Sequence, residues 1–384
     1  MKEEYVTIRK DIPMEFNELK LLKYEGDRIK CVENGIVIPP FEILIHPTAK
    51  CNLKCSWCIG QNITEDKNEP INNVLTADDN LMNLAHSIIS YKKEVEIDNQ
   101  KKIFGVERVS FSGITGDPMM AQRQLIPVLD ELHSNNIQTG MFTNGLLINK
   151  NNIDTISKMD YILISVDAGN SDTYNKMKNN GKSSNYFEQL MKNIERLNDY
   201  KIANNRSIEV NVGFVLNQYN YTELYSLAEN LKFIGVSNLR IKTDISRKLL
   251  IDSKLFDQVE EQYDLIRKNL EDECFKLVEL HRIFNSEDRE RYFSKCLINK
   301  LYANVSSDGY VYACNYHPAI RGIKFGNVTE KPFNIIWEQA NKDFDISKCP
   351  RTCDPFKNRA NNMLNSYLNN ESYKNKVDEY LGTI

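Results

Sequence analysis

Short apolar runs alternate with longer amphipathic stretches through residues 41–245 of this chain. The runs are rich in Val, Ile, Phe and Tyr, which favours strands, whereas the stretches repeat apolar residues at helical spacing. The predicted strands are Phe41–His46, Arg108–Ser112, Gln138–Phe142, Tyr161–Val166, Ile208–Val215 and Asn238–Lys242. The predicted helices are 76–94 (opened by Thr76-x-x-Asp79, a capping-box pattern), 119–135, 172–198 and 220–233.

This regular succession predicts an α/β fold. Six βα units in a row favour a parallel sheet curled into a partial (β/α)6 TIM-like barrel. In such sheets ligands bind at the C-terminal ends of the strands. The residues that directly follow each predicted strand are therefore the first candidates for a functional site.

We expect the barrel to span residues 41–250. Three further segments precede or follow it. Residues 1–40 predict a short N-terminal hairpin that ends at Pro39-Pro40. Residues 251–292 are highly charged and predict a helical connection. Residues 293–384 predict a small domain with a β-hairpin, short helices and a C-terminal surface helix; its hairpin strands are Tyr302–Val305 and Tyr310–Ala313.

Composition excludes several classes of protein. The net charge of −4 over 384 residues leaves no basic excess for nucleic acid or an anionic membrane surface. No apolar run reaches the roughly 18–20 residues of a membrane span, and the first residues lack a signal-peptide core. Nine cysteines, an odd number, argue against a disulfide framework. We therefore expect a cytoplasmic protein without nucleic-acid or membrane partners.

Three cysteines follow the first predicted strand as Cys51-Asn-Leu-Lys-Cys55-Ser-Trp-Cys58. Three thiolates in one loop are an incomplete set for a structural zinc ion, which takes four ligands. A cubane [4Fe–4S] cluster also takes four, so three cysteines leave one iron open for a ligand. This arrangement suits catalysis, and a chance trio of loop cysteines is the alternative.

The CxxxCxxC spacing at this place resembles the radical S-adenosylmethionine (SAM) superfamily. The resemblance implies that Cys51, Cys55 and Cys58 hold a [4Fe–4S] cluster and that SAM binds its open iron. It further implies reductive cleavage of SAM to a 5′-deoxyadenosyl radical, which takes a hydrogen atom from a substrate C–H bond. The SAM-binding residues that the resemblance implies are Trp57, Ser112, Gly113, Gly116, Asp117, Thr143, Asn144, Ser165, Asp167, Val215 and Asn217.

The resemblance also gives these residues individual roles. Trp57 would pack beside the adenine, with a core tryptophan as the alternative. The turn at 112–118 would receive the methionine ammonium, although Thr115 and Asp117 stand where the family has glycine and glutamate. Thr143-Asn144-Gly145 matches the family's "TNG", Ser165 and Asp167 resemble its ribose contacts, and the segment 212–221 resembles its stretch beside the adenine.

A second cysteine group lies near the C-terminus and consists of Cys296, Cys314, Cys349 and Cys353. Gly309-x4-Cys314, Gly326-Asn327 and Phe333–Trp337 resemble the SPASM/Twitch extension of radical SAM enzymes. Four cysteines suit one fully ligated auxiliary [4Fe–4S] cluster, the Twitch form, and a four-cysteine zinc site is the alternative. A cluster without an open iron is suited to electron transfer or structural support.

Two cysteines and two histidines complete the candidates. Cys274 is our catalytic candidate, a thiol hydrogen donor, because we expect its segment to face the barrel mouth; Cys31 is the second choice. A buried apolar role is the alternative for both cysteines. His281 and His317 could act as acid or base, with a surface or core histidine as the alternative.

The sequence thus favours a radical SAM oxidoreductase that acts on a small polar substrate such as a sugar, aminocyclitol or nucleoside. We expect a dehydrogenation in natural-product or cofactor biosynthesis, because one auxiliary cluster suits an electron acceptor and the 40-residue preface is short for a peptide-recognition domain. The alternative is a maturase or epimerase of ribosomally made peptides, and a zinc-binding scaffold without activity is more distant. A flavodoxin- or ferredoxin-like reductant is the expected redox partner.

Overall fold

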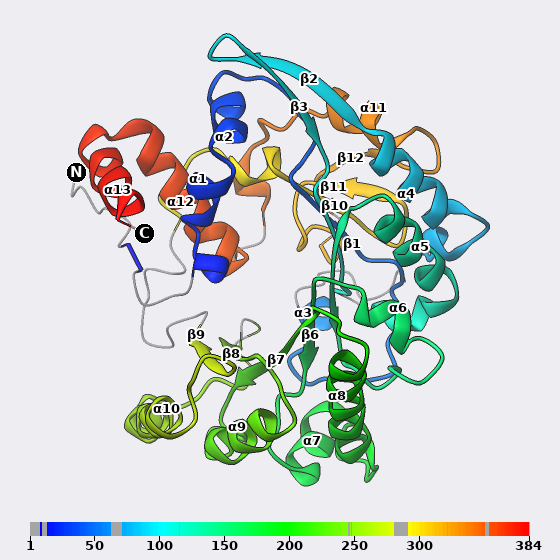
Figure 1. The fold of residues 1–384 in the computed structure, drawn as a ribbon, viewed down its shortest axis with the longest axis vertical. Coiled ribbons are helices and arrows are strands. Elements are labelled where there is room, and N and C mark those ends of the chain that lie inside the picture. The colour runs from blue at the N-terminus through cyan, green and yellow to red at the C-terminus, as the bar shows by residue number, and fades with distance from the viewer. Residues whose placement is uncertain are drawn as a thin grey trace.

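A curved sheet with helices along its outer side organises the chain (Figure 1). The strands of this sheet run in the order β12-β11-β10-β1-β4-β5-β6-β7-β8-β9, and β2 and β3 form a separate two-stranded sheet. The computed structural model describes residues 8–9, 14–62, 71–114, 116–244, 246, 248–279, 291–320, 322–349 and 353–383.

Six parallel strands form the centre of the sheet, and all six lie where the apolar runs predicted them. They are β1 (Glu42–Ile45), β4 (Arg108–Phe111), β5 (Gln138–Thr143), β6 (Tyr161–Ser165), β7 (Glu209–Leu216) and β8 (Asn238–Thr243). Ile43 and Ile45 pack into the core between sheet and helices. Because side chains alternate along a strand, Glu42 points to the opposite side, the lumen face. The α/β fold with a partial barrel is confirmed.

The sheet extends beyond these six strands on both sides. β9 (Lys276–Glu279) pairs in parallel with β8. On the other side β10 (Tyr302–Val305) pairs in parallel with β1, with Ala303 opposite Ile43. β11 (Tyr310–Tyr312) and β12 (Lys324–Asn327) continue the sheet in antiparallel fashion. The predicted C-terminal hairpin is confirmed, and it belongs to the same sheet as the barrel.

Helices cover the outer face of the sheet (Figure 1). They are α4 (Asn80–Ser90), α5 (Gln122–Ser134), α6 (Ile153–Ser157), α7 (Ser171–Lys178), α8 (Tyr186–Ala203), α9 (Leu224–Phe233) and α10 (Phe256–Asn269). The predicted helix 172–198 is two helices, because the connecting turn holds Gly181 at a φ of +73°. Two shorter helices are α3 (Ile59–Asn62) and α11 (Phe333–Gln339). Within the described part of the chain, no helix has the length and apolar character of a membrane span.

The predicted helix 76–94 is shorter than expected at both ends. α4 begins at Asn80, and the side chain of Asp79 makes no capping hydrogen bond, so the capping box is wrong. After α4 the chain forms the hairpin of β2 (Lys92–Ile97) and β3 (Gln100–Gly105). Asp98 and Asn99 make its tight turn at φ values of +51° and +61°, a conformation that these two residue types tolerate.

The predicted N-terminal hairpin is wrong, because α1 (Lys20–Tyr24) and α2 (Gly26–Glu33) occupy that segment. Leu21, Ile29 and Val32 pack in one cluster with residues of α12 (Pro355–Asn369) and α13 (Glu371–Gly382). Figure 1 shows the blue N-terminal helices beside the red C-terminal ones. The C-terminal tail is therefore a pair of helices with a buried face and not one surface helix.

The predicted helical connection at 251–292 is only half helical. α10 accounts for its first part, but Leu277 and Val278 then lie in β9, buried on opposite faces of the sheet. A strand forms here because β8 offers a free edge for parallel pairing. Residues 280–290, with the candidate His281, lie outside the described residues.

Candidate functional site

The cysteine loop and the predicted SAM residues gather at the C-terminal edge of the parallel strands. The backbone N–H of Ser112, directly after β4, donates to the carbonyl of Ile45 at the end of β1 (2.9 Å). On the other side of the sheet, Val166 donates to Gly213 in β7 (3.1 Å). The parallel register thus brings together loops that lie far apart in the sequence.

Helix α7 holds the cysteine loop in place. The N–H of Lys54 donates to the carbonyl of Lys178 and the N–H of Ser56 to that of Met177, both at 3.0 Å. These carbonyls belong to the last turn of α7, which has no further helical N–H to accept from. From the other side, Asn144 donates to Asn52 at 2.7 Å. The loop is therefore clamped between β5 and α7.

The three thiols of this loop form one electrostatic group. Burial raises the pKa of Cys55 to about 12, and the neighbouring Cys58 and Cys51 add to the increase. Burial also raises the pKa of Cys51. Crowded thiols with raised pKa values suit a cationic metal centre, which takes them as thiolates. The described residues contain no cluster of three His, Cys, Asp or Glu tight enough for a single ion. Three cysteines in one loop match the three thiolates that a cubane with one open iron takes.

The turn after β4 requires its two glycines. A Cβ on Gly113 would lie 1.9 Å from the carbonyl oxygen of Gly116, and one on Gly116 would lie 2.3 Å from that of Thr48. Such distances are far inside van der Waals contact, so a side chain at either position would displace the backbone. The turn therefore packs tightly against the segment that leads into the cysteine loop.

Asp117, the predicted partner of the SAM ammonium, is buried and bound to the chain itself. Its carboxylate accepts hydrogen bonds from the N–H of Met119 (3.0 Å), the hydroxyl of Thr143 (3.0 Å) and the N–H of Asn144 (2.7 Å). Burial raises its pKa, against the lowering effect of these donors. This geometry makes Asp117 a positioning residue that ties the turn to the end of β5.

Asp167, a predicted ribose contact, likewise serves the fold. It adopts a φ of +61°, and its carboxylate accepts from Lys178 Nζ (2.8 Å) and the N–H of Val215 (2.7 Å). Both charged side chains are almost fully buried. Sequence reasoning missed Lys178, because no local pattern distinguishes it from a solvated helix lysine. Ser165 remains half-buried at the end of β6 on the lumen face.

The remaining predicted SAM residues shape the neighbouring loops. Trp57 is buried, with 8% of its surface exposed. Asn217 donates to the carbonyl of Val215 (2.8 Å), and its own N–H donates to Asn220 (2.8 Å). Asn220 in turn donates to the carbonyl of Asp167 (2.9 Å). This chain of bonds fixes the loop after β7 against the loop after β6.

The four C-terminal cysteines also meet in one place. Burial raises the pKa of Cys349 to about 12, with further increases from Cys314 and Cys296. The pKa of Cys353 is raised by burial and by Cys314 and Cys296 as well. The cysteines come from the loops before β10, after β11 and before α12, so only the folded chain assembles them. Their number and crowding fit an auxiliary cluster.

Asn361 on α12 is a supporting residue that sequence reasoning missed. It donates to Cys296 Sγ at 3.4 Å and accepts from the N–H groups of Leu297 (2.7 Å) and Ile298 (3.0 Å). A signal was present, because α12 repeats asparagine at Asn358, Asn361 and Asn362, all buried. Asparagine is a poor helix former, and its repetition on one helix face indicates hydrogen bonding.

Of the remaining candidates, Cys274 and Cys31 lie away from the cysteine loop, whereas His317 lies in the turn after Cys314, where its N–H donates to the Cys314 carbonyl (3.2 Å). Cys274 is exposed and precedes β9, where the N–H of Lys276 donates to Ser237 ahead of β8 (3.0 Å). It therefore lies at the N-terminal edge of the sheet, and the expectation that it faces the barrel mouth is wrong. Cys31 is fully buried in an apolar cluster. His317 is also buried, which lowers its pKa to about 4, and its Nδ1 accepts from the N–H of Ile323 (2.8 Å).

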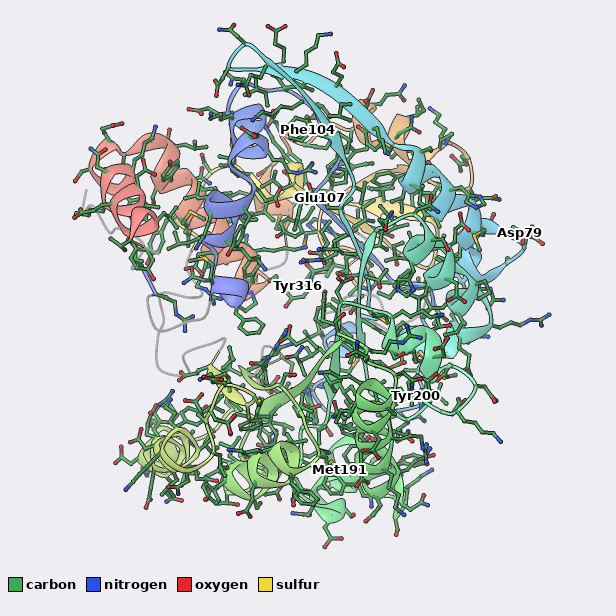
Figure 2. The ribbon with its side chains drawn as sticks, in the orientation of Figure 1. Asp79, Phe104, Glu107, Met191, Tyr200 and Tyr316 are labelled. Carbon is green, nitrogen blue, oxygen red and sulfur yellow. The ribbon has the colours of Figure 1, made fainter. Side chains whose placement is uncertain are left out.

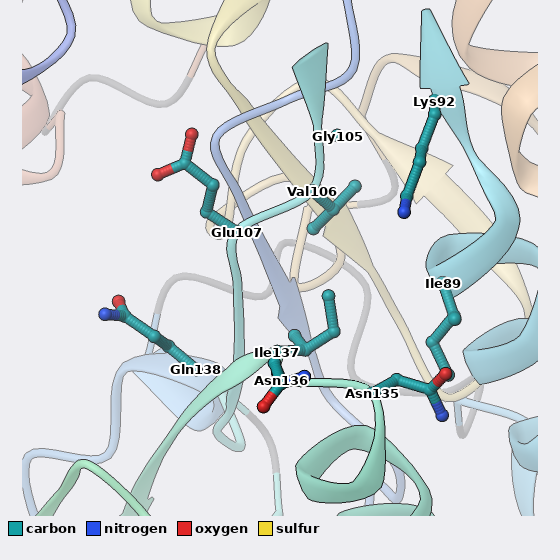
Figure 3. A pocket seen from close by; sticks show the side chains of 9 residues that line it. All are labelled: Ile89, Lys92, Gly105, Val106, Glu107, Asn135, Asn136, Ile137 and Gln138. Atoms are coloured by element: carbon teal, nitrogen blue, oxygen red, sulfur yellow. The ribbon is translucent and has the colours of Figure 1, made fainter. Parts of the chain in front are cut away.

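A cavity of about 370 Å³ lies at the same remote edge (Figure 3). Its lining includes Lys92, Glu107 and Gln138, which stand before or at the start of strands. Catalytic sites of βα barrels lie at the other end of the strands. None of the described cysteines lines this cavity, so it is separate from both cysteine groups.

Two family models match the chain. The model described as the radical SAM superfamily matches residues 45–231, and the SPASM model, an iron–sulfur cluster-binding domain, matches residues 296–357. The chain is thus a radical SAM enzyme with a C-terminal SPASM-type auxiliary domain. Its cofactors are SAM and [4Fe–4S] clusters, one at the SAM site and one auxiliary.

Solved structures share this fold at low sequence identity. SuiB of Streptococcus suis bound to the precursor peptide SuiA is 16% identical, with a TM-score of 0.56 over 88% of this chain and 75% of that one. Native anSMEcpe with bound AdoMet is also 16% identical, with a TM-score of 0.56 over 90% of this chain and all (100%) of the other. A structure of anSMEcpe with AdoMet and the Kp18Cys peptide has a TM-score of 0.54. A search of curated proteins found no match.

Proposed function

We propose that this protein uses radical SAM chemistry to modify a peptide. The observation that carries the proposal is the fold it shares, over 88–90% of its length, with two enzymes whose structures contain peptides. These neighbours support the peptide alternative over the small polar substrate that the sequence favoured. At 16% identity they support no particular peptide sequence.

The contacts deep in the barrel lumen favour a substrate that binds near the mouth and does not reach the far end of the lumen. Deep in the lumen, Ser110 lies 2.8 Å from the hydroxyl of Tyr161 and donates to Glu42 at 2.5 Å. Arg108 lies 4.0 Å from Glu42 and donates to Gln138 at 2.8 Å. Polar groups that already bind one another are poor partners for a sugar. A peptide side chain presented at the mouth needs no access to this depth.

Residues of this chain would position the cluster and SAM relative to the substrate. Cys51, Cys55 and Cys58 would ligate the cluster that, with SAM, supplies the hydrogen-abstracting chemistry when bound. The clamp from Asn144 and the carbonyl of Lys178 would keep that loop from shifting. Such positioning matters because small displacements of a reacting group cost large factors in rate.

The second cysteine group lies toward the other end of the strands, because Cys296 precedes β10 and Cys314 follows the antiparallel β11. A substrate in the lumen would lie between this group and the cysteine loop, which supports a role in removing an electron from the substrate. Lys357 of α12 donates to Asn304 on β10 (3.4 Å), and its charge lowers the pKa of Cys314 against the effect of burial. The charge of Lys357 also contributes to lowering the pKa of buried His46, directly after β1, so this residue acts on both the barrel and the auxiliary segment. We favour an oxidative modification, with epimerisation as the alternative. Cleavage of SAM also consumes one electron, which a flavodoxin- or ferredoxin-like protein would donate.

The test compares peptides with small molecules under anaerobic conditions. Reconstituted enzyme, SAM and dithionite would be supplied with a carbon-deuterated random peptide library, or with deuterated sugars and nucleosides. We expect deuterium in 5′-deoxyadenosine only with peptides, read by mass spectrometry. Transfer from the small molecules alone would overturn the proposal.

The cysteine loop offers a matched control for the same assay. The triple variant Cys51→Ala/Cys55→Ala/Cys58→Ala should form no 5′-deoxyadenosine above background, because the open-site cluster is lost. Cys274→Ala should retain full activity, because that thiol lies at the remote edge of the sheet. Normal 5′-deoxyadenosine from the triple variant would refute the assignment of the loop.

A further inference from the structure

Lys242 occupies a distinctive place at the barrel mouth. It is the penultimate residue of β8 and lies directly opposite Val215 of β7 in the parallel register. Leu239 and Ile241 of the same strand pack into the outer core. Alternation therefore directs Arg240 and Lys242 to the lumen face, with Lys242 nearer to the C-terminal edge.

Lys242 has no partner of its own, unlike the other cations near it. Lys178 is paired with Asp167 at 2.8 Å, and the guanidinium of Arg240 lies 4.2 Å from the centre of the Phe16 ring. Across the described segments, Lys242 makes no hydrogen bond and no ion pair, although its side chain is only partly exposed. A half-buried ammonium without a partner is costly, because it loses water without gaining a counter-charge.

The surroundings of Lys242 make it sensitive to an added negative charge. Burial and the charge of Arg240 lower its pKa. The carboxylates of Asp167 and Asp354 act in the opposite direction, but Asp167 is bound to Lys178, and Asp354 caps α12 by accepting from the N–H of Lys357 (3.0 Å). Neither acid is free to pair with Lys242.

Auxiliary residues flank the same place. The charge of Asp354, which follows the last cysteine of the auxiliary group, acts on both Lys242 and Tyr316. Figure 2 shows Tyr316 at the margin of the auxiliary segment, on the side of β8 and β9. Lys242 therefore stands where a substrate between the two cysteine groups would pass.

We propose that Lys242 binds a carboxylate of the peptide substrate, so that the enzyme selects peptides with an acidic residue near the modified position. This inference rests on the proposed peptide function. A carboxylate would give Lys242 the charge-assisted partner that the chain itself does not provide. The bond forms at the mouth, beside the loop after β7, and fixes which part of the peptide faces the SAM site.

SAM also carries a carboxylate that Lys242 could bind. The test therefore distinguishes a peptide carboxylate from the carboxylate of SAM. Two deuterated random peptide libraries would be compared, alike except that one replaces every Asp and Glu by Asn and Gln. Deuterium in 5′-deoxyadenosine reports hydrogen abstraction whatever the sequence. SAM affinity would be measured separately by equilibrium dialysis without peptide.

The wild-type enzyme should transfer at least about ten times as much deuterium from the acidic library as from the library without Asp and Glu. This is the size of effect expected for one charge-assisted bond. Lys242→Gln should abolish this preference, Lys242→Arg should retain most of it, and SAM affinity should stay unchanged in both. Lys192→Gln, an exposed lysine on the outer helix α8, is the matched control and should behave as wild type.

Three results would overturn the inference. The first is a preference that persists in Lys242→Gln or is absent from the wild type. The second is a tenfold loss of SAM affinity in Lys242→Gln, which would assign the lysine to SAM. The third is no transfer from either library while SAM is still cleaved; this result alone would refute the peptide function itself.

Discussion

At the scale of single residues, two buried carboxylates hold the SAM edge of the sheet together. Asp117 binds the N–H of Asn144, and Asp167 binds the N–H of Val215. Each links the loop after one strand to its neighbour. A buried carboxylate that accepts several backbone donors orients the loops firmly, but it depends on every one of those partners.

Lys178 provides the first prediction. Lys178→Met leaves the charge of Asp167 buried without its partner, which typically costs about 3–5 kcal/mol. We expect a lower thermal midpoint and loss of iron from the cysteine loop, since Lys178 belongs to the turn that clamps it. Anaerobic calorimetry and iron analysis would measure both.

The double variant Lys178→Met/Asp167→Asn is the control for this prediction. It removes both charges, so it should recover much of the lost stability. A double variant as unstable as the single one would show that packing around Lys178, and not its charge, is what matters.

At the scale of elements, a small charge cluster joins α2 to the loop after β3. Arg28 lies 2.9 Å from Glu25 and 2.7 Å from Glu107. Its guanidinium also stacks over the ring of Phe104, with 5.2 Å to the ring centre. Figure 2 shows Phe104 and Glu107 beside the N-terminal helices. Burial and the charge of Glu107 raise the pKa of Glu25 to about 7, against the effect of Arg28.

This pKa predicts a pH-dependent stability. Because the folded state raises the pKa of Glu25 from 4.5 to about 7, its contribution to stability is complete below pH 4.5 and is lost as the pH rises through 7. The slope is at most about 1.4 kcal/mol per pH unit. Between pH 5 and 7.5, the thermal midpoint of Glu25→Gln should depend less on pH than that of the wild type. Parallel curves for the two proteins would contradict the assignment.

At the scale of the whole molecule, the pairing of β10 with β1 makes the two cysteine groups parts of one sheet. The loop of Cys51 follows β1, and Cys314 follows β11, which pairs with β10. The terminal helices pack on each other as well. The auxiliary segment therefore shares the sheet of the SAM barrel and is not an appendage.

Because the barrel and the auxiliary segment share one sheet, we expect a destabilising substitution in one of them to impair the other. Ala303 on β10 is fully buried, and Ala303→Asp would place an unpaired charge in the core beside β1. We expect SAM cleavage to fall at least about tenfold, and iron to fall well below the roughly eight atoms of two cubanes. Ala203→Asp, on the exposed end of α8, should leave both unchanged. Four irons with full SAM cleavage in Ala303→Asp would show that the segments are independent.

The sequence by itself determined the central strands and the cysteine spacings. Short apolar runs rich in Val, Ile, Phe and Tyr placed all six central strands, because these residue types favour the buried, pleated surface of a sheet. The three cysteines of the loop lie within eight residues, so their proximity is a property of the covalent chain. Where short-range patterns were ambiguous, as in the N-terminal helices and in β2 and β3, the prediction was wrong or silent.

Only the tertiary structure decided which residues meet across long distances in the chain. The pairing of β1 with β10, the bond of Asn361 to Cys296 and the remote place of Cys274 all depend on the order of strands in the sheet. The isolation of Lys242 is also invisible in the sequence, because a missing partner is a property of everything packed around a side chain. Local periodicity sets the elements, but burial, charge pairing and the composition of a site are set by contacts between elements.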